Sequence, residues 1–207
     1  IQYFKKALKG LGLVHASNSV FTYTLSQADK YVITPQIYDD GYIEFLLAYC
    51  RKENVSAIIS LFDIDLPILA KNKKAFAENG ITVVVSDYDV TQICNDKWQT
   101  YKFLDSVGLP RIPTFIRLDD VIQSLDNGDV TFPLILKPRW GMGSIGIYTV
   151  NNENELDVLY HKLHQEIFDT YLKYESGVDA DSCIVIQKKI VGQEYGMEIL
   201  NDLSGNY

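Results

Sequence analysis

Short apolar runs alternate with amphipathic segments through residues 11–86. Two of these runs, Ala57–Leu61 and Ile81–Val85, are continuous, which is typical of strands buried on both faces of a parallel sheet. Strands that alternate with helices predict an open α/β sheet flanked by helices. The strands expected here are Leu13–Ser17, Tyr31–Thr34, Ala57–Leu61 and Ile81–Val85, and the helices are Ile43–Glu53 and Leu66–Asn79, the second ended by Gly80.

The first ten residues are spaced as a helix. Ile1, Phe4 and Leu8 recur at helical spacing, and Gly10 is a helix-ending residue. An α/β domain rarely opens in mid-helix without a strand before it. We therefore expect the sequence to be a fragment whose parallel sheet lacks its first strand.

The alternation changes at residues 86–89. Asn95-Asp96 can cap a helix from Lys97 to about Val107, and Gly108 ends that helix. Further along we expect strands at 114–117, 183–187 and 195–200, helices at 119–125 and 153–172, and a hairpin turn at 202–205.

The run 134–150 carries the clearest chemistry. An apolar strand ends in Lys137, the turn Gly141-x-Gly143-x-x-Gly146 follows, and a second strand comes next. Glycines let backbone N–H groups converge on an anion, and Lys137 and Arg139 place positive charge beside the turn. This combination favours a nucleotide triphosphate as the ligand.

The same spacing has other interpretations. The dinucleotide fingerprint needs a helix after the glycines, but Ile145, Ile147 and Val150 favour a strand. A protein-kinase glycine loop is also a hairpin over phosphates, but its lysine comes on a later strand. A glycine-rich hairpin without any ligand is the remaining alternative.

Composition narrows the class of protein. With 207 residues and 47% hydrophobic content, the chain can hold one large or two small globular domains. No apolar run reaches the length of a membrane span, and a net charge of −8 argues against general nucleic-acid binding. The three cysteines Cys50, Cys94 and Cys183 lie too far apart for a zinc or redox motif, so we expect buried thiols in a reducing cytoplasm.

The order of the motifs resembles the ATP-grasp superfamily. The matching runs are Asn95-Asp96-Lys97, Ile135-Leu136-Lys137-Pro138, the glycine loop and residues 186–194. Within the superfamily the chain looks similar to carbamoyl phosphate synthase large-subunit-like ligases. The resemblance implies a Rossmann-like pre-ATP-grasp domain with a parallel sheet over residues 1–90, followed by an incomplete α+β ATP-grasp domain over residues 91–207.

The resemblance also implies roles for single residues. Lys97 and Lys137 match the two lysines that contact ATP, the second at the α- and β-phosphates, and the loop 141–146 matches the lid over the phosphates. The Lys188 carbonyl and the Ile190 N–H would read the adenine edge, and Glu194 would hold the ribose. Gln187 stands where family members often carry glutamate. The expected ATP-binding residues are Lys97, Lys137, Arg139, Gly141, Gly143, Ser144, Gly146, Gln187, Lys188, Ile190 and Glu194.

The implied function is that of an ATP-grasp ligase. Such an enzyme uses ATP to convert a carboxylate or bicarbonate into an acyl phosphate, which an amine or other nucleophile attacks. The expected cofactors are ATP and Mg²⁺, with the metal ligands beyond residue 207, so we expect the fragment to be inactive alone. The expected partners are a nucleotide and a small carboxylate, without nucleic acid or membrane, and a homo-oligomer is left open.

Alternatives remain at this point. The chain could be a non-catalytic nucleotide-binding module, or, less favoured, a NAD-dependent oxidoreductase. His161 and His164 have metal-binding spacing on a helix, but solvated histidines are favoured. Asp63 and Asp65 follow a strand, where α/β sheets bind ligands, but a helix cap is the favoured role.

Overall fold

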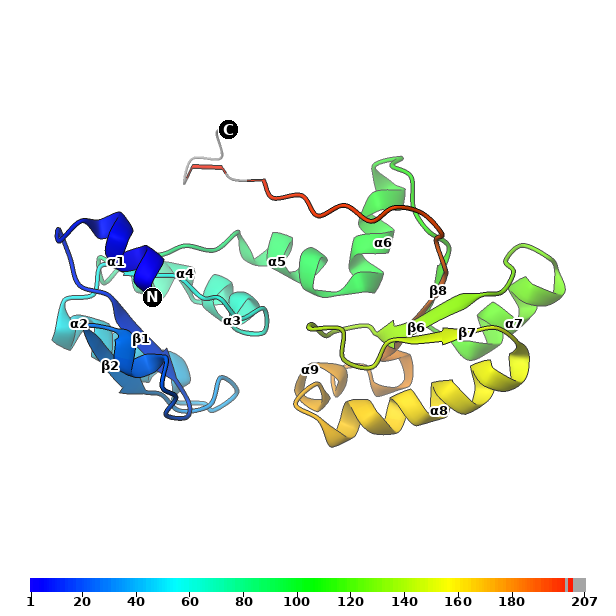
Figure 1. The fold of residues 1–207 in the computed structure, drawn as a ribbon, viewed down its shortest axis with the longest axis horizontal. Helices are drawn as coiled ribbons and strands as arrows, with labels where there is room; N and C mark the ends of the chain where they lie inside the picture. The colour runs from blue at the N-terminus through cyan, green and yellow to red at the C-terminus, as the bar shows by residue number, and fades with distance from the viewer. Residues whose placement is uncertain (200, 203–207) are drawn as a thin grey trace. The chain divides into compact units, whose positions relative to one another are not determined.

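The computed structural model describes residues 1–199 and 201–202. The chain divides into two compact units, residues 1–85 and residues 86–207, which we call the N-terminal unit and the C-terminal unit (Figure 1).

The N-terminal unit contains two separate pairs of parallel strands. Strand β1 pairs with β2, and β3 pairs with β4 in the register Ala57 to Thr82. The parallel pairing predicted from the alternating pattern is therefore confirmed. In chain order the elements are α1 (Gln2–Leu8), β1 (His15–Asn18), the 3-10 helix η1 (Leu25–Gln27), β2 (Lys30–Ile33), α2 (Tyr42–Glu53), β3 (Ala57–Ile58), α3 (Asp65–Lys71), α4 (Lys73–Ala77) and β4 (Thr82–Val83).

Helices and strands of this unit differ in detail from the prediction. The helix expected over 66–79 is interrupted at Asn72, whose side-chain amide donates to the Ile68 carbonyl (2.8 Å) and so competes with the backbone pattern. The strand expected over 57–61 stops at Ile58. Its side chains Ile59 and Leu61, expected to be buried, are 48% and 82% exposed.

A small core holds the N-terminal unit together. The buried side of α2, with Tyr42, Leu46 and Cys50, packs with residues of α3, α4 and β4. The buried residues of α2 recur at helical spacing on one side, so the amphipathic helix predicted here is confirmed.

The C-terminal unit is built on one antiparallel sheet of four strands. Its strand order is β5-β8-β6-β7, and all three pairings are antiparallel. The elements are α5 (Tyr88–Asn95), α6 (Lys97–Ser106), β5 (Thr114–Phe115), α7 (Leu118–Asp126), β6 (Leu134–Pro138), β7 (Tyr148–Val150), α8 (Glu153–Asp169), α9 (Lys173–Ser176), the 3-10 helix η2 (Ala180–Ser182) and β8 (Ile184–Lys188).

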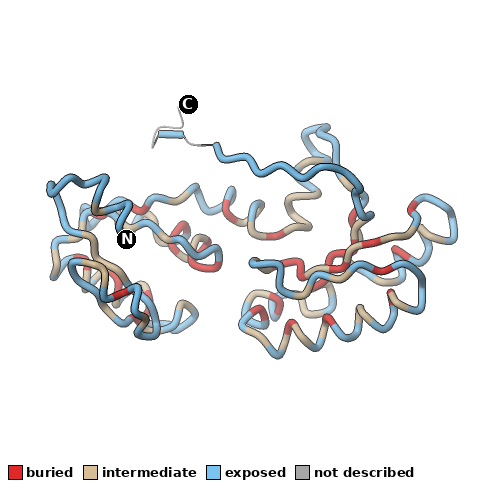
Figure 2. The backbone as a smooth tube through the Cα atoms, in the orientation of Figure 1, coloured by how far each residue is buried: buried red, intermediate tan, exposed pale blue. Residues whose placement is uncertain are grey.

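The core of this unit lies between the sheet and α8. Leu134 and Leu136 of β6 and Ile186 of β8 are fully buried and share a cluster with Leu163 of α8. Figure 1 shows α8 running along β6 and β7, and Figure 2 shows the buried residues concentrated on the sheet and on one side of this helix.

Some expectations for the second half are wrong. Residues 88–95 form a helix that the sequence pattern did not predict, and the helix expected over 153–172 ends at Asp169. Residues 195–199 are exposed and form no strand, because no described segment pairs with their backbone groups. The expected hairpin turn at 202–205 lies mostly outside the described residues. Cys94 is exposed, whereas Cys50 and Cys183 are buried as expected.

Candidate functional site

The two faces of the C-terminal sheet have different roles. Successive side chains of β6 point to opposite faces, so Leu134 and Leu136 enter the core while Ile135 and Lys137 face the other way. The register pairs Ile135 with Gln187 of β8, and Gln187 in turn pairs with Thr114 of β5. Pairing therefore gathers Thr114, Lys137 and Gln187 on the face opposite α8.

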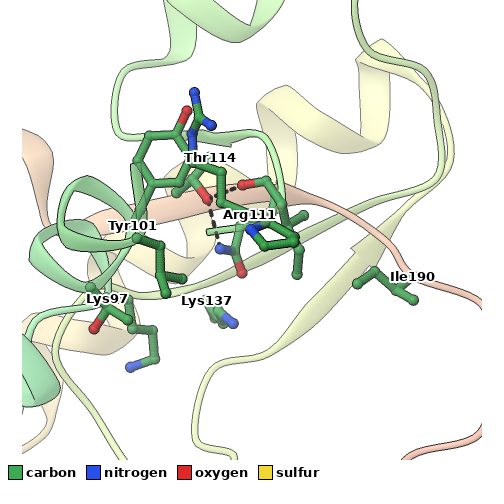
Figure 3. A pocket seen from close by; sticks show the side chains of 11 residues that line it. Lys97, Tyr101, Arg111, Thr114, Lys137 and Ile190 are labelled. Carbon is green, nitrogen blue, oxygen red and sulfur yellow. Dashed lines mark hydrogen bonds between the residues drawn. The ribbon is translucent and has the colours of Figure 1, made fainter. Parts of the chain in front are cut away.

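A pocket of about 540 Å³ covers this face (Figure 3). Four of the residues expected at the nucleotide site line it, namely Lys97, Lys137, Gln187 and Ile190. Side chains of α6 and of the segment before β5 supply most of the remaining wall, which is largely apolar. These residues are Thr100, Tyr101, Leu104, Pro110, Arg111, Ile112 and Thr114.

Lys137 brings a positive charge into an apolar setting. Its side chain is half-buried, and burial lowers the pKa of its ammonium group below the ordinary value. Within residues 1–199 and 201–202, no acidic or other acceptor group contacts this ammonium. A desolvated cation without a counter-charge is costly unless an anion binds, so the site is suited to a negatively charged ligand.

Lys97 is hydrogen-bonded to the backbone where the glycine loop begins. Its ammonium donates to the carbonyl oxygens of Gly141 (3.0 Å) and Arg139 (3.3 Å), and its backbone N–H donates to the same Arg139 carbonyl. In the view of Figure 3, Lys97 and Lys137 lie near one another, while Ile190 lies apart from both. The structure thus brings the two predicted lysines to one pocket.

The orientation of the Gln187 amide follows from its partner. The Thr114 hydroxyl donates its single proton to the Ile112 carbonyl (2.9 Å), so it can only accept from Gln187 Nε2, which lies 2.8 Å away. Both bonds are drawn in Figure 3. The Gln187 carbonyl oxygen is consequently the end of the amide that is left to accept a hydrogen bond from a ligand.

The other residues expected near adenine and ribose lie on the last strand and beyond it. Lys188 ends β8, and the Lys189 backbone N–H donates to the Pro133 carbonyl (3.0 Å). The backbone N–H of Ile190 bonds to no acceptor within the described residues. Glu194 is exposed in the segment after β8 and does not line the pocket.

Arg139 has a different position from the one expected. Its guanidinium is buried and makes a two-pronged contact with Asp96 (2.8 and 2.7 Å) and a further contact with Asp179 (2.8 Å). It also lies 4.2 Å over the Trp140 ring. Burial opposes its charge, but the two carboxylates outweigh burial and raise the pKa of Arg139. These contacts do not support the prediction that Arg139 binds ATP. They indicate that Arg139 holds the end of β6 to Asp96 and Asp179.

Asp96 is the buried ion-pair partner of Arg139. Its carboxylate caps α6 by accepting from the backbone N–H groups of Trp98 and Gln99, as the sequence predicted. The same carboxylate accepts from Arg139, 43 positions later. One buried ion pair therefore fixes the start of α6, where Lys97 lies, to the end of β6.

The glycine loop is the predicted connection between two antiparallel strands, β6 and β7. Gly143, Ser144 and Gly146 adopt left-handed backbone angles, with φ of 63°, 61° and 68°. A Cβ atom at Gly146 would lie 2.6 Å from Leu163, whereas one at Gly143 would meet nothing. Gly146 is thus needed for packing on α8, and the tip around Gly143 and Ser144 is open.

Sequence reasoning missed several residues that shape the pocket. Thr114 was placed only in a strand, yet it fixes the amide of Gln187, 73 positions away. Tyr101 and Leu104 lie in the helix predicted after Asp96, and they form part of the pocket wall. No local signal could identify these roles, because each depends on strand pairing or helix packing across the unit.

The weaker candidates have structural roles. His161 lies 3.6 Å from Asp157, and His164 contacts the Ala180 carbonyl. Asp65 is buried at the start of α3 and accepts from the Tyr42 hydroxyl (3.0 Å). The described residues include no group of three or more His, Cys, Asp or Glu side chains that could hold a metal.

Two family models match the chain. Residues 1–84 match the PylC-like N-terminal domain, and residues 130–207 match the ATP-grasp domain.

Curated relatives are similar over part of their length. A D-alanine–D-alanine ligase from Thermotoga sp. (strain RQ2) is 29% identical over 126 residues, which is 61% of this chain and 35% of the ligase. The carbamoyl phosphate synthase large chain of Neisseria meningitidis serogroup B is 23% identical over 155 residues, which is 72% of this chain and 14% of the synthase. The chain thus spans about a third or less of these relatives.

Solved structures share the fold. The biotin carboxylase domain of a 2-oxoglutarate carboxylase from Hydrogenobacter thermophilus, a dimer in complex with MgADP, ADP and bicarbonate, aligns with a TM-score of 0.65 at 20% identity. The alignment covers 91% of this chain and 42% of that domain. An L-amino acid ligase from Bacillus licheniformis aligns with a TM-score of 0.64 at 22% identity and covers 90% and 43%.

The described helices are all too short or too polar to span a membrane. The motifs, the antiparallel sheet with its glycine hairpin and the two family models agree with one another. The predicted resemblance is confirmed, and the chain carries a PylC-like N-terminal domain followed by a domain of the ATP-grasp family.

Proposed function

We propose that this chain is the ATP-binding part of a ligase that uses ATP to activate a carboxylate or bicarbonate as an acyl phosphate. An amine or another nucleophile would then attack the acyl phosphate. The observation that carries the proposal is the half-buried ammonium of Lys137, which lacks a counter-charge among the described residues and lines a pocket with Lys97 and Gln187.

The expected nucleotide-binding residues other than Arg139 each have a chemical role in this proposal. Lys137 holds the phosphates as a mobile point charge, and Lys97 ties the glycine loop to α6 beside them. The Gln187 carbonyl accepts from the amino group of adenine, and the Ile190 N–H donates to the ring. The glycine loop 141–146, with the Ser144 hydroxyl, covers the phosphates and excludes water, while Glu194 and Lys188 complete the nucleotide contacts at ribose and base.

The relatives inform the proposal. Their names include D-alanine–D-alanine ligase, L-amino acid ligase and carbamoyl phosphate synthase, which all point to ATP-dependent joining reactions at a carboxyl or bicarbonate group. We propose that the specific reaction is that of a carbamoyl-phosphate-synthase-like carbon–nitrogen ligase. We further propose that the boundary between the two domains lies near residue 90 and that the protein is cytoplasmic. Whether it forms a homo-oligomer is left open.

Magnesium does not fit the described residues by themselves. The described part of the chain has no group of three or more His, Cys, Asp or Glu side chains that could hold a divalent cation, and we expect the metal ligands beyond residue 207. When bound, such an ion would neutralise charge that develops during phosphoryl transfer.

Activity is tested on the full-length protein with ATP, candidate carboxylates and hydroxylamine. The proposal predicts ADP release that depends on a carboxylate, with hydroxylamine trapping the acyl phosphate as a hydroxamate. Tight ATP binding without any such turnover would favour a non-catalytic nucleotide-binding module instead. An NADH fluorescence change would favour the oxidoreductase, although the strand after the glycines argues against it.

The adenine contact has its own test in Thr114→Val. Without the hydroxyl, the Gln187 amide can flip and present its NH₂ group to the base. We expect the preference for ATP over GTP to fall about tenfold, the effect of one hydrogen bond of about 1.4 kcal/mol. Thr100→Val, which changes a hydroxyl on another wall of the pocket, is the control. Unchanged preference in Thr114→Val would separate Gln187 from base recognition.

A further inference from the structure

The side chain of Lys97 donates to two peptide units at the start of the glycine loop. Its ammonium lies 3.3 Å from the Arg139 carbonyl oxygen and 3.0 Å from the Gly141 carbonyl oxygen. The backbone N–H of Lys97 also donates to the Arg139 carbonyl, at 3.3 Å. Within the described residues, the Gly141 carbonyl therefore depends on the ammonium alone, whereas the Arg139 carbonyl has a second donor.

A bond at the Gly141 carbonyl also fixes the N–H group of Met142. The two groups belong to one planar trans peptide unit, in which C=O and N–H point in opposite directions. The Met142 N–H is consequently directed away from the Lys97 ammonium. This N–H bonds to no acceptor within residues 1–199 and 201–202.

The backbone changes from packed to open at this peptide unit. A Cβ atom at Gly141 would lie 3.3 Å from Pro138, whereas one at Gly143 would meet nothing within 4 Å. Both glycines have positive φ, 152° and 63°, where a glycine backbone turns at little steric cost. The unit that joins Gly141 to Met142 thus lies between two permissive residues, and the Lys97 ammonium is the group that holds it.

We infer that Lys97 is a positioning residue for the glycine loop, because its ammonium fixes the Gly141–Met142 peptide unit before a nucleotide binds. The loop then has an ordered start that ends at Met142 and a freer tip that begins at Gly143. An ammonium has three donors, so these contacts are compatible with a phosphate contact as well.

This order has a consequence for ATP binding. A loop whose start is already fixed loses less conformational entropy when it closes on a ligand, so less of the binding free energy is spent on ordering it. This consequence rests on the proposed function, because it takes ATP as the ligand. The positioning of the loop by Lys97 is tested without any nucleotide.

The experiment measures ¹⁵N relaxation of the full-length protein in the absence of nucleotide. Its main reporter is the Met142 N–H, which shares a peptide unit with the Gly141 carbonyl. Lys97→Met keeps an unbranched side chain of similar length without a donor, and Lys97→Arg keeps both donors and charge. The matched control is Lys102→Met, which changes an exposed lysine of the same helix that does not line the pocket.

We expect the order parameter of the Met142 N–H to fall from about 0.85 to below about 0.6 in Lys97→Met, the change from rigid to flexible backbone. It stays near the unsubstituted value in Lys97→Arg and Lys102→Met. The Trp140 N–H keeps its order in every variant. Trp140 is buried, and the Arg139 carbonyl in its peptide unit still accepts from the backbone N–H of residue 97.

Unchanged order at Met142 in Lys97→Met would overturn the inference, and so would an equal loss of order in Lys97→Arg. A loss that extends to Trp140 and to the amides of β8 would also overturn it, because Lys97 would then support the whole unit rather than the loop. ATP affinity is measured separately by calorimetry, so failure of the proposed function and failure of this inference give different results.

Discussion

The two units of this chain contain similar apolar runs, but these runs differ in how far they are buried. In the C-terminal unit, Leu134 and Leu136 of β6 are fully buried, because β7 and β8 flank that strand and α8 covers one face. In the N-terminal unit, Ile59 and Leu61 follow a two-residue strand with one paired edge and stay exposed. An apolar run thus becomes a buried strand only where both of its edges have partners.

The same comparison separates the places where function can be assigned. The complete sheet presents an ordered face on which Thr114, Lys137 and Gln187 converge through their register. In the N-terminal unit, where the two strand pairs are separate, a cavity is lined by residues around β1 and β3 and by side chains of α1 and α2. The pocket on the four-stranded sheet is a candidate ligand site because strand register brings its polar side chains together.

The largest effect that tests this contrast comes from truncating a core residue. Leu136→Ala removes a fully buried side chain, so we expect it to lower the free energy of unfolding of the C-terminal unit by about 2–5 kcal/mol. Ile59→Ala removes a half-exposed side chain and is expected to cost less than about 1 kcal/mol.

Denaturant titration followed by tryptophan fluorescence measures the first effect, because both tryptophans, Trp98 and Trp140, lie in the C-terminal unit. Amide hydrogen exchange in β3 and β4 measures the second. Equal losses in the two variants would contradict the contrast between a complete and a divided sheet.

The next effect concerns the Asp96–Arg139 ion pair, which joins the start of α6 to the end of β6. Asp96→Asn keeps a good helix cap but removes the charge that faces the buried Arg139, so we expect a loss of about 3 kcal/mol. Asp179→Asn removes the more exposed partner and should cost about 1 kcal/mol or less. Thermal unfolding of the two variants gives the comparison, and a larger loss for Asp179→Asn would reverse our assignment of the main partner.

The glycine loop gives a smaller and more local effect. Gly143→Ala and Gly146→Ala both place a side chain on a left-handed backbone, at a cost of about 1–2 kcal/mol. At Gly146 the new Cβ also meets Leu163 at 2.6 Å, so this variant should lose about 1 kcal/mol more. Thermal unfolding measures the difference, and equal stability of the two variants would show that the loop is not packed on α8 as described.

How far the sequence predicts this molecule depends on the range of each interaction. The parallel pairing of β3 with β4 and the glycine hairpin follow from local patterns of apolar residues and glycines. The cap at Asp96 also follows from its position before an amphipathic helix. Local signals of this kind act within a few residues, and they predict elements and their order.

Interactions between distant residues were not predictable in the same way. Arg139 looked like a phosphate ligand because the sequence could not show that Asp96 and Asp179 surround it. The break at Asn72 and the role of Thr114 likewise depend on single hydrogen bonds chosen by the tertiary structure. The lysines at the pocket could be proposed from sequence, but their convergence required the register of the sheet.

The central claim is that Lys137 binds the phosphates of ATP, and calorimetric titration of the full-length protein with ATP tests it most directly. Lys137→Ala is compared with Lys102→Ala, which removes an exposed lysine of α6 that does not line the pocket. We predict that ATP affinity falls roughly 5- to 150-fold in Lys137→Ala, the equivalent of about 1–3 kcal/mol for a charge-assisted contact, and stays unchanged in Lys102→Ala. Unchanged ATP affinity in a folded Lys137→Ala protein would remove Lys137 from the site and contradict the account.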